Sequence, residues 1–154
     1  MLLLLEFIPY ITIFLFGIVV GSFLNVCIYR LPERESIVKG PSHCMSCGAQ
    51  LRWFDLIPLF SWLFLRGRCR RCKAEISVQY PIIEGLNGFL WVFVFLVNGM
   101  NVMSVVYCLM TSALLVLSVI DWRTFEIPFG INVFLGILGI VAVVLDKGEW
   151  LNHV

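Results

Sequence analysis

The sequence predicts an all-α polytopic membrane protein with about four transmembrane helices and a small four-cysteine segment after the first helix. The first observation is composition, because 60% of the 154 residues are hydrophobic and only 14% are charged. Such a chain is too apolar for an ordinary soluble domain. The second observation is a series of four long apolar runs, and the third is a pair of Cys-x-x-Cys motifs in the only long polar stretch.

Four apolar runs define the expected membrane spans, each judged against the roughly 20 residues that a helix needs to cross a bilayer. They cover residues 7–28, 82–97, 102–120 and 127–145. The run 82–97 is the shortest, so we expect it to need Tyr80 and Pro81 at its entrance and a locally thinner bilayer.

A cleaved signal peptide is the alternative for the first run. No basic residue precedes that run, however, and Glu6 stands where positive charge is expected.

The basic residues predict the orientation of the chain in the membrane. Lys and Arg accumulate in loops that stay in the cytoplasm. We therefore expect residues 1–29 to form the first transmembrane helix, 30–80 a cytoplasmic segment, and 81–154 the helices two to four. Nine of the eleven Lys and Arg residues fall between the first two spans: Arg30, Arg34, Lys39, Arg52, Arg66, Arg68, Arg70, Arg71 and Lys73.

The cytoplasmic segment contains Cys44, Cys47, Cys69 and Cys72 as two Cys-x-x-Cys pairs with 21 residues between them. Each pair presents two thiolates from one tight turn, and two such turns close a tetrahedron around one Zn²⁺, as in a zinc ribbon. Two disulfides or unligated thiols are the alternatives, and a reducing compartment disfavours the disulfides. Because cysteine fills all four positions, none is left for a catalytic water. The expected site is therefore a structural Zn²⁺ site in a zinc-ribbon-like segment.

The basic and aromatic residues of this segment also raise nucleic acid as a ligand. The stretch 56–65 is largely apolar, however. Such a stretch is more typical of a membrane-surface or core element than of a platform for stacked bases. We therefore expect membrane lipid, and no nucleic acid, as a partner.

Asp121 follows directly after the third apolar run. A carboxylate at the end of a membrane helix is a candidate for chemistry, because ionisable groups at such positions are costly and commonly functional. The alternative is an ordinary interfacial aspartate paired with Arg123. The residues by themselves leave both interpretations open.

Four motifs then carry a resemblance that covers nearly the whole chain. They are GSFLNVCIYRLP at 21–32, the two Cys-x-x-Cys pairs, YPIIE at 80–84 and DWRTFEIP at 121–128. In this order they resemble the amino-terminal part of the prepilin peptidases, the type 4 prepilin leader peptidases and N-methyltransferases. The resemblance implies an enzyme of the bacterial inner membrane. It would cut the leader from type IV prepilins or type II secretion pseudopilins and methylate the new amino terminus with S-adenosylmethionine.

Proteolysis in this family uses two aspartates, each at the cytoplasmic end of a membrane helix, and Asp121 matches the first. One carboxylate takes a proton from the attacking water, while the other, protonated, supports the developing oxyanion. The second aspartate normally lies in a Gly-x-Gly-Asp motif, which residues 1–154 do not contain. Phe129 also stands where the family tends to carry an aspartate.

Three explanations for the missing carboxylate stay open. The chain is a fragment of a longer enzyme, a short homologue that has lost proteolysis, or a homo-oligomer in which two copies share Asp121. Gly17 and Gly21 form a Gly-x-x-x-Gly pair that permits close helix packing, either within the chain or between copies. The alternative outside enzymology is a non-catalytic, zinc-stabilised membrane scaffold or partner subunit.

The residues for methylation are harder to assign. No Gly-x-Gly-x-x-Gly loop marks a site for the nucleotide-like donor. Asn25, Arg30 and Glu84 are polar positions within the matched motifs at the expected cytoplasmic membrane edge, so they are candidates for contacting substrate or methyl donor. Each has a simpler alternative: an interhelical hydrogen bond, a positive anchor and a helix N-terminal charge, respectively.

Overall fold

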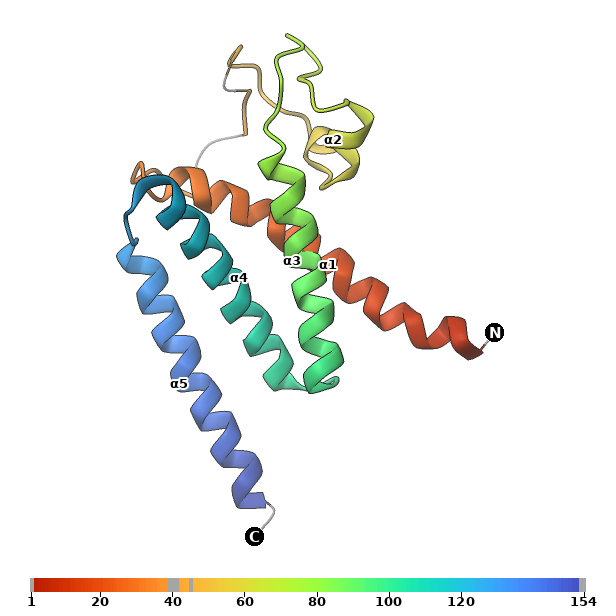
Figure 1. Cartoon of the computed structure of the whole chain (residues 1–154), viewed down its shortest axis with the longest axis vertical. Coiled ribbons are helices and arrows are strands. Elements are labelled where there is room, and N and C mark those ends of the chain that lie inside the picture. Colours follow the sequence, from red (N-terminus) through yellow and green to blue (C-terminus); the bar gives the residue numbers. More distant parts are fainter. Residues whose placement is uncertain (1, 39–41, 45, 153–154) are drawn as a thin grey trace.

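The computed structural model describes residues 2–38, 42–44 and 46–152, so Lys39 of the basic set lies outside the described residues. In these ranges the regular structure is helical, with no strand and only two isolated β-bridges. Figure 1 shows the long helices with the cysteine segment gathered beyond one of their ends. The elements are α1 (Leu2–Arg30), the 3-10 helix η1 (Trp53–Leu56), α2 (Phe60–Phe64), α3 (Gln79–Asn98), α4 (Val102–Thr124) and α5 (Phe129–Asn152).

Four helices of the described chain are long and apolar enough to cross a membrane, which confirms the four predicted spans. The second begins at Gln79 rather than at residue 82, so it has 20 residues and matches the bilayer without local thinning. Pro81 fits inside its first turn, because the N–H groups there have no partner within the helix. The spans are Glu6–Arg30, Gln79–Asn98, Val102–Thr124 and Phe129–Asp146.

The Gly-x-x-x-Gly pair of α1 packs against α3 of the same chain. A Cβ atom on Gly17 would lie 2.7 Å from the Cα atom of Gly88, and one on Gly21 would lie 2.7 Å from the Cα atom of Glu84. Only glycine allows two helix backbones to approach this closely. Figure 1 shows α1 and α3 crossing each other.

The buried core joins α1, α3 and α4, with a smaller contribution from α5. Ile28 of α1 and Ile120 of α4 are fully buried in it, and α5 adds the buried Ile131. Most other large apolar side chains of α5 are exposed. This pattern is expected for a helix that presents its surface to lipid, because acyl chains are as apolar as the side chains.

Candidate functional site

The cysteine segment is built from two turns with the same backbone pattern. In each turn the first cysteine donates its N–H to the carbonyl five residues later and accepts from the N–H four residues later. The distances are 2.9 and 2.9 Å in the turn of Cys44, and 2.8 and 3.0 Å in the turn of Cys69. The residue after each second cysteine has a positive φ, 66° at Gly48 and 61° at Lys73. Both turns therefore aim two sulfur atoms at one point.

The four cysteine sulfur atoms form a single cluster. All of them lie within 4.8 Å of one another, and the Sγ atoms of Cys44 and Cys72 are 3.8 Å apart. Sulfur ligands about 2.3 Å from a tetrahedral zinc would be about 3.8 Å apart, whereas a disulfide needs about 2.0 Å. All four cysteines are free thiols. The predicted cluster is confirmed as a group that could hold a metal ion, and four sulfur donors in a tetrahedron suit Zn²⁺.

The thiols of the cluster differ in how readily they ionise. Backbone N–H groups of Cys47 and Ser46 lower the pKa of the Cys44 thiol to about 6. The N–H of Ala74 also lowers the pKa of Cys72, but desolvation and the three neighbouring thiols outweigh it and raise that pKa to about 11. One thiolate thus opposes the ionisation of the next. A divalent cation at the centre would remove this opposition.

Trp62 of α2 holds the second cysteine turn in place. Its indole N–H donates to the carbonyl oxygen of Ile76 at 3.2 Å, and the N–H of Ile76 donates to Gly67 at 2.7 Å. Gly67 has a φ of 67°, and a Cβ atom there would lie 2.9 Å from Trp62 Cζ2. The indole therefore packs directly on the strand-like backbone that leads to Cys69.

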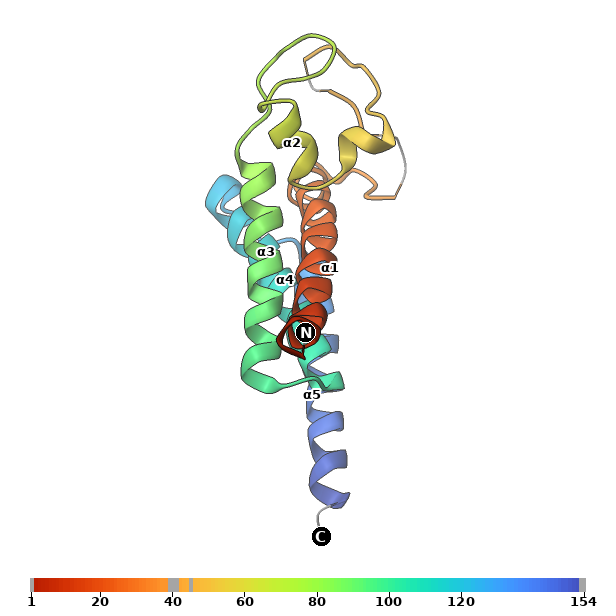
Figure 2. The same cartoon turned by 90° about the vertical axis from the view of Figure 1, so that its right-hand side faces the viewer.

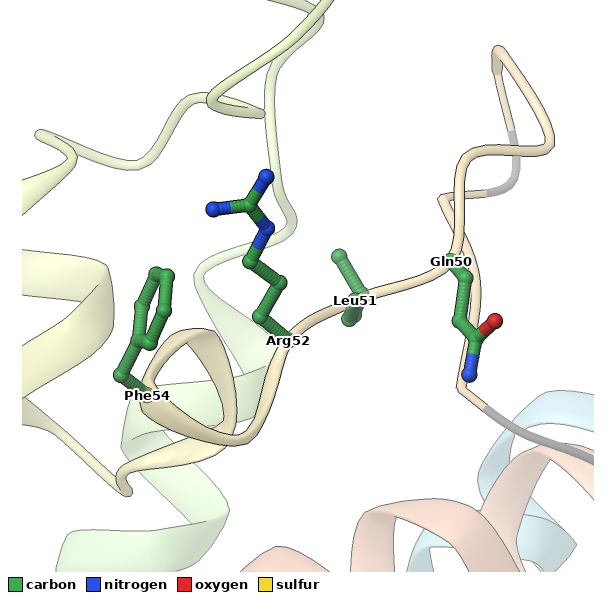
Figure 3. A pocket seen from close by; sticks show the side chains of 4 residues that line it. All are labelled: Gln50, Leu51, Arg52 and Phe54. Carbon is green, nitrogen blue, oxygen red and sulfur yellow. The ribbon is translucent and has the colours of Figure 1, made fainter.

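Two guanidinium groups lie over the ring of Phe54. The Cζ atoms of Arg52 and Arg70 are 5.8 and 5.1 Å from the ring centroid, and Arg70 also pairs with Asp55 at 2.9 Å. In Figure 3 Arg52 and Phe54 lie side by side. The sequence analysis considered the basic and aromatic residues of this segment only as a nucleic-acid surface, and it did not predict that these side chains meet. The place offers positive charge and one aromatic ring. Beside it an open hollow of about 460 Å³ is lined by Gln50, Leu51, Arg52 and Phe54.

Asp121 lies exposed in the last turn of α4, where the N–H of Phe125 donates to its carbonyl oxygen at 2.9 Å. Two residues later, the Cζ atom of Arg123 lies 4.3 Å from the ring centroid of Tyr29, near the end of α1. Tyr29 in turn stacks on Tyr80, at the start of α3, with centroids 5.4 Å apart. This stack brings the end of α4 to the end of the helix bundle that carries the cysteine segment (Figures 1 and 2).

Asn25 and Arg30, two of the candidates for substrate or methyl donor, bind the chain itself. The side-chain amide of Asn25 is buried and donates to the carbonyl oxygen of Tyr80 at 3.1 Å. Its Oδ1 atom has no hydrogen-bond partner among the described residues. Arg30 donates from Nη1 to the carbonyl oxygen of Ser36 at 2.9 Å, which closes the loop after α1. The interhelical hydrogen bond expected as the simpler role of Asn25 is therefore present.

Glu84, the third candidate, ties α3 to the cysteine segment. Its Oε2 atom accepts a 2.7 Å hydrogen bond from the N–H of Leu59, and its side chain is buried. Leu59 has φ 59° and ψ −52°, and the N–H of Phe60 donates to the carbonyl of Pro58 at 2.6 Å. This is a γ-turn of the rare, strained type. The Glu84 carboxyl group therefore stabilises the γ-turn at Leu59, directly after which α2 begins.

A buried chain of hydrogen bonds between the membrane helices was not predicted from the sequence. The indole N–H of Trp91 donates to Ser112 Oγ at 2.9 Å, and the Ser112 hydroxyl donates to Asn87 Oδ1 at 2.8 Å. Asn87 is 0% exposed. The only signal in the sequence is a polar residue within an apolar run, and such a residue does not identify its partner.

Comparisons with curated proteins point to one kind of enzyme. The chain is 41% identical over 142 residues to a "Prepilin leader peptidase/N-methyltransferase" of Myxococcus xanthus (strain DK1622). The aligned stretch covers 91% of this chain and 42% of that protein. It is 39% identical over 140 residues to a protein of the same name from Pectobacterium carotovorum subsp. carotovorum. That alignment covers 73% of this chain and 48% of the relative. The chain thus spans less than half the length of these relatives. No solved structure matches it significantly.

A third relative is the "Type 4 prepilin-like proteins leader peptide-processing enzyme" of Escherichia coli O78:H11 (strain H10407 / ETEC). It is 35% identical over 123 residues, which cover 68% of this chain and 46% of the relative. Residues 15–98, which are more than half of the chain, match the family described as "Bacterial Peptidase A24 N-terminal domain". That stretch runs from within α1 to the end of α3 and includes the whole cysteine cluster. The chain therefore belongs to the bacterial peptidase A24 N-terminal domain family, in agreement with the resemblance to prepilin peptidases.

Proposed function

We propose that this chain supplies the amino-terminal domain and the first catalytic aspartate of an enzyme that processes prepilins or pseudopilins. The proposed enzyme cleaves the leader peptide and N-methylates the new amino terminus. The names of the relatives support this assignment. The single observation that carries it is the stack of Arg123, Tyr29 and Tyr80, because it joins the helix end that bears Asp121 to both ends of the cysteine segment.

In this proposal Asp121 is one of two carboxylates that act on the scissile peptide bond. Its exposure at the end of α4 leaves the carboxylate open to a substrate and to a water molecule. One carboxylate accepts a proton from the water, and its protonated partner donates a hydrogen bond to the carbonyl oxygen. The partner is not in a Gly-x-Gly-Asp motif of residues 1–154. A carboxylate from outside these residues, or Asp121 of a second copy, is needed for cleavage.

We propose the bacterial inner membrane as the location, with the cysteine segment and Asp121 on the cytoplasmic side. The segment carries nine of the eleven basic residues, and such clustering is typical of loops that are not translocated. The proposed division is 1–29 for the first membrane helix, 30–80 for the segment and 81–154 for the remaining helices. The bounds of α1 and α3 are compatible with this division.

The proposed metal is a structural Zn²⁺ held by Cys44, Cys47, Cys69 and Cys72, and the proposed methyl donor is S-adenosylmethionine. The closed set of four thiols supports a structural role, because no ligand position is left for water. The methyl donor follows only from the methyltransferase names of the relatives. The roles of Asn25, Arg30 and Glu84 toward substrate or donor stay predictions.

A chimera with the Myxococcus xanthus relative tests the peptidase assignment. This chain would replace the matched 142 residues of that protein, and the purified chimera would be assayed for prepilin cleavage in lipid vesicles. We expect cleavage by the chimera and none by this chain alone. Asp121→Asn should lower the chimera's rate by about a hundredfold or more, since a general acid–base group is lost. Glu126→Gln, an exposed change in the following turn, is the matched control and should leave the rate unchanged.

An active Asp121→Asn chimera would remove the peptidase assignment and favour the non-catalytic scaffold. Cleavage by this chain alone that disappears with Asp121→Asn would instead establish a site shared by two copies. The metal assignment is tested separately by the zinc content of the purified chain, with about one equivalent expected. Cys44→Ser should abolish zinc binding, whereas Cys27→Ser, a buried change within α1, should retain it. A metal-free chain under reducing conditions would contradict the zinc site.

A further inference from the structure

The short helix α2 exposes three large apolar side chains. Phe60, Leu63 and Phe64 are 51%, 63% and 84% exposed. Their spacing of three and four residues places them on one face of the helix. Exposed apolar surface of this kind marks a place where a protein contacts another protein, a ligand or a membrane.

The opposite face of α2 is fixed by hydrogen bonds, so the apolar face cannot turn inward. The hydroxyl of Ser61 donates to the carbonyl oxygen of Asp55 at 2.7 Å. The indole of Trp62 donates to the carbonyl oxygen of Ile76 at 3.2 Å. These bonds hold the face of Ser61 and Trp62 against the rest of the cysteine segment, and they leave Phe60, Leu63 and Phe64 on the outside.

The start of α2 lies beside a membrane-spanning helix. The N–H of Leu59 donates to Glu84 Oε2 at 2.7 Å, and a Cβ atom on Gly85 would lie 4.0 Å from Leu59 Cδ2. Glu84 is the sixth residue of α3, about 8 Å along the axis from the helix start. Because the 20 residues of α3 just match a bilayer core of about 30 Å, Leu59 lies about 8 Å inside the boundary between headgroups and acyl chains, and interfacial helices bury their apolar face to about this depth. Figure 2 shows α2 next to the first turns of α3.

Positive charge follows directly after this apolar face. Arg66 and Arg68 are exposed, and neither forms an ion pair with a described residue. A large apolar face beside free cationic groups is the surface that interfacial helices present to membranes with anionic lipids. Five residues are too few to bind a membrane alone. Attachment to α3 removes this difficulty, because a tethered group acts at high effective concentration.

We propose that α2 is an interfacial anchor that inserts Phe60, Leu63 and Phe64 into the bilayer at the boundary between headgroups and acyl chains. Arg66 and Arg68 contact the phosphates of anionic lipids there. The bilayer thereby fixes the orientation of the cysteine turns, which are joined to α2 through Trp62. This proposal does not depend on the enzymatic activity proposed above.

Photocrosslinking in the full chain tests the anchor. Benzoylphenylalanine would be placed at position 64 in place of Phe64, and the chain would be reconstituted in vesicles of phosphatidylcholine and phosphatidylglycerol. The control carries the same group in place of Gln50, an exposed residue of the first cysteine turn. Mass spectrometry after irradiation should find phospholipid adducts several-fold more often at position 64 than at position 50. Equal yields at the two positions would overturn the proposal, as would adducts at position 64 that join only two protein chains.

The charge part is tested with the double variant Arg66→Glu and Arg68→Glu carrying the crosslinker at position 64. We expect a several-fold lower adduct yield in vesicles that contain phosphatidylglycerol and no change in pure phosphatidylcholine. An unchanged adduct yield in both kinds of vesicle would show that the two arginines do not contribute to the anchor. Both substitutions are at exposed positions, and an unchanged thermal unfolding curve would establish that the variant is folded.

Discussion

The side-chain amide of Asn87 donates a hydrogen bond of 2.7 Å to the carbonyl oxygen of Gly17. A polar side chain of α3 thus binds the backbone of α1 within the membrane-spanning region. The same side chain accepts the hydroxyl of Ser112 from α4 at 2.8 Å. One buried amide therefore joins three helices, beside the close glycine contact of α1 with α3.

Replacement of Asn87 should loosen these three helices. Asn87→Leu removes the bond to Gly17 and leaves the Ser112 hydroxyl without its acceptor in an apolar region. We expect the free energy of unfolding in detergent to fall by about 1–3 kcal/mol. Asn132→Leu, an exposed change of the same kind on α5, is the control. Equal stability of the two variants would mean that the buried amide contributes little.

The contact between α1 and α3 should be intolerant of a single added methyl group. Gly17→Ala would place a Cβ atom 2.7 Å from the Cα atom of Gly88, so the two backbones must separate. Overpacking of this kind costs about 1–3 kcal/mol, to be measured by thermal unfolding. Gly139→Ala is the control, because nothing lies within 4 Å of a Cβ atom there. A stabilised Gly17→Ala variant would contradict the close packing.

The membrane spans and the cysteine cluster could be predicted because their signals are local. Twenty apolar residues in a row predict a spanning helix wherever they occur, and the two Cys-x-x-Cys pairs predict turns that aim sulfur atoms at one point. Both predictions are confirmed. The start of α3 was placed too late, because Gln79, Tyr80 and Pro81 are not strongly apolar although they form its first turn.

The contacts that organise the site could not be predicted, because they join residues far apart in the chain. Glu84 was considered as a substrate contact or a helix N-terminal charge, yet its carboxyl group accepts the N–H of Leu59, 25 residues earlier. Likewise, hydropathy does not indicate that Arg123 lies over Tyr29. An apolar stretch such as 56–65 predicts burial in protein or lipid, but the exposed face of α2 follows only from the hydrogen bonds of its other face.

The stack of Arg123 on Tyr29 should stabilise the end of α4 by a small amount and only locally. Arg123→Ala removes the guanidinium that lies 4.3 Å from the ring centroid of Tyr29. An exposed cation–π contact contributes about 0.5–1 kcal/mol, so we expect faster amide hydrogen exchange at residues 121–125 and little change in overall unfolding. Arg123→Lys should keep most of the protection, because it retains the charge. Arg34→Ala, an exposed change outside the stack, should leave this exchange as it is; an equal effect of both alanine variants would contradict the stack.

Glu84 should control how firmly the cysteine segment is held to the membrane helices. Glu84→Leu removes the only acceptor that the structure gives to the N–H of Leu59, in a γ-turn that is already strained. An N–H group left without its acceptor in a buried place costs about 1–3 kcal/mol, so amide exchange in residues 59–64 should become about tenfold faster or more. Glu84→Gln keeps one acceptor oxygen, so its exchange rate should lie between those of Glu84→Leu and the parent chain. Glu75→Leu, an exposed change in the same segment, should have no such effect. If exchange in α2 is the same in Glu84→Leu as in the parent chain, then the segment is held in place by the bilayer and its cysteine turns rather than by this bond.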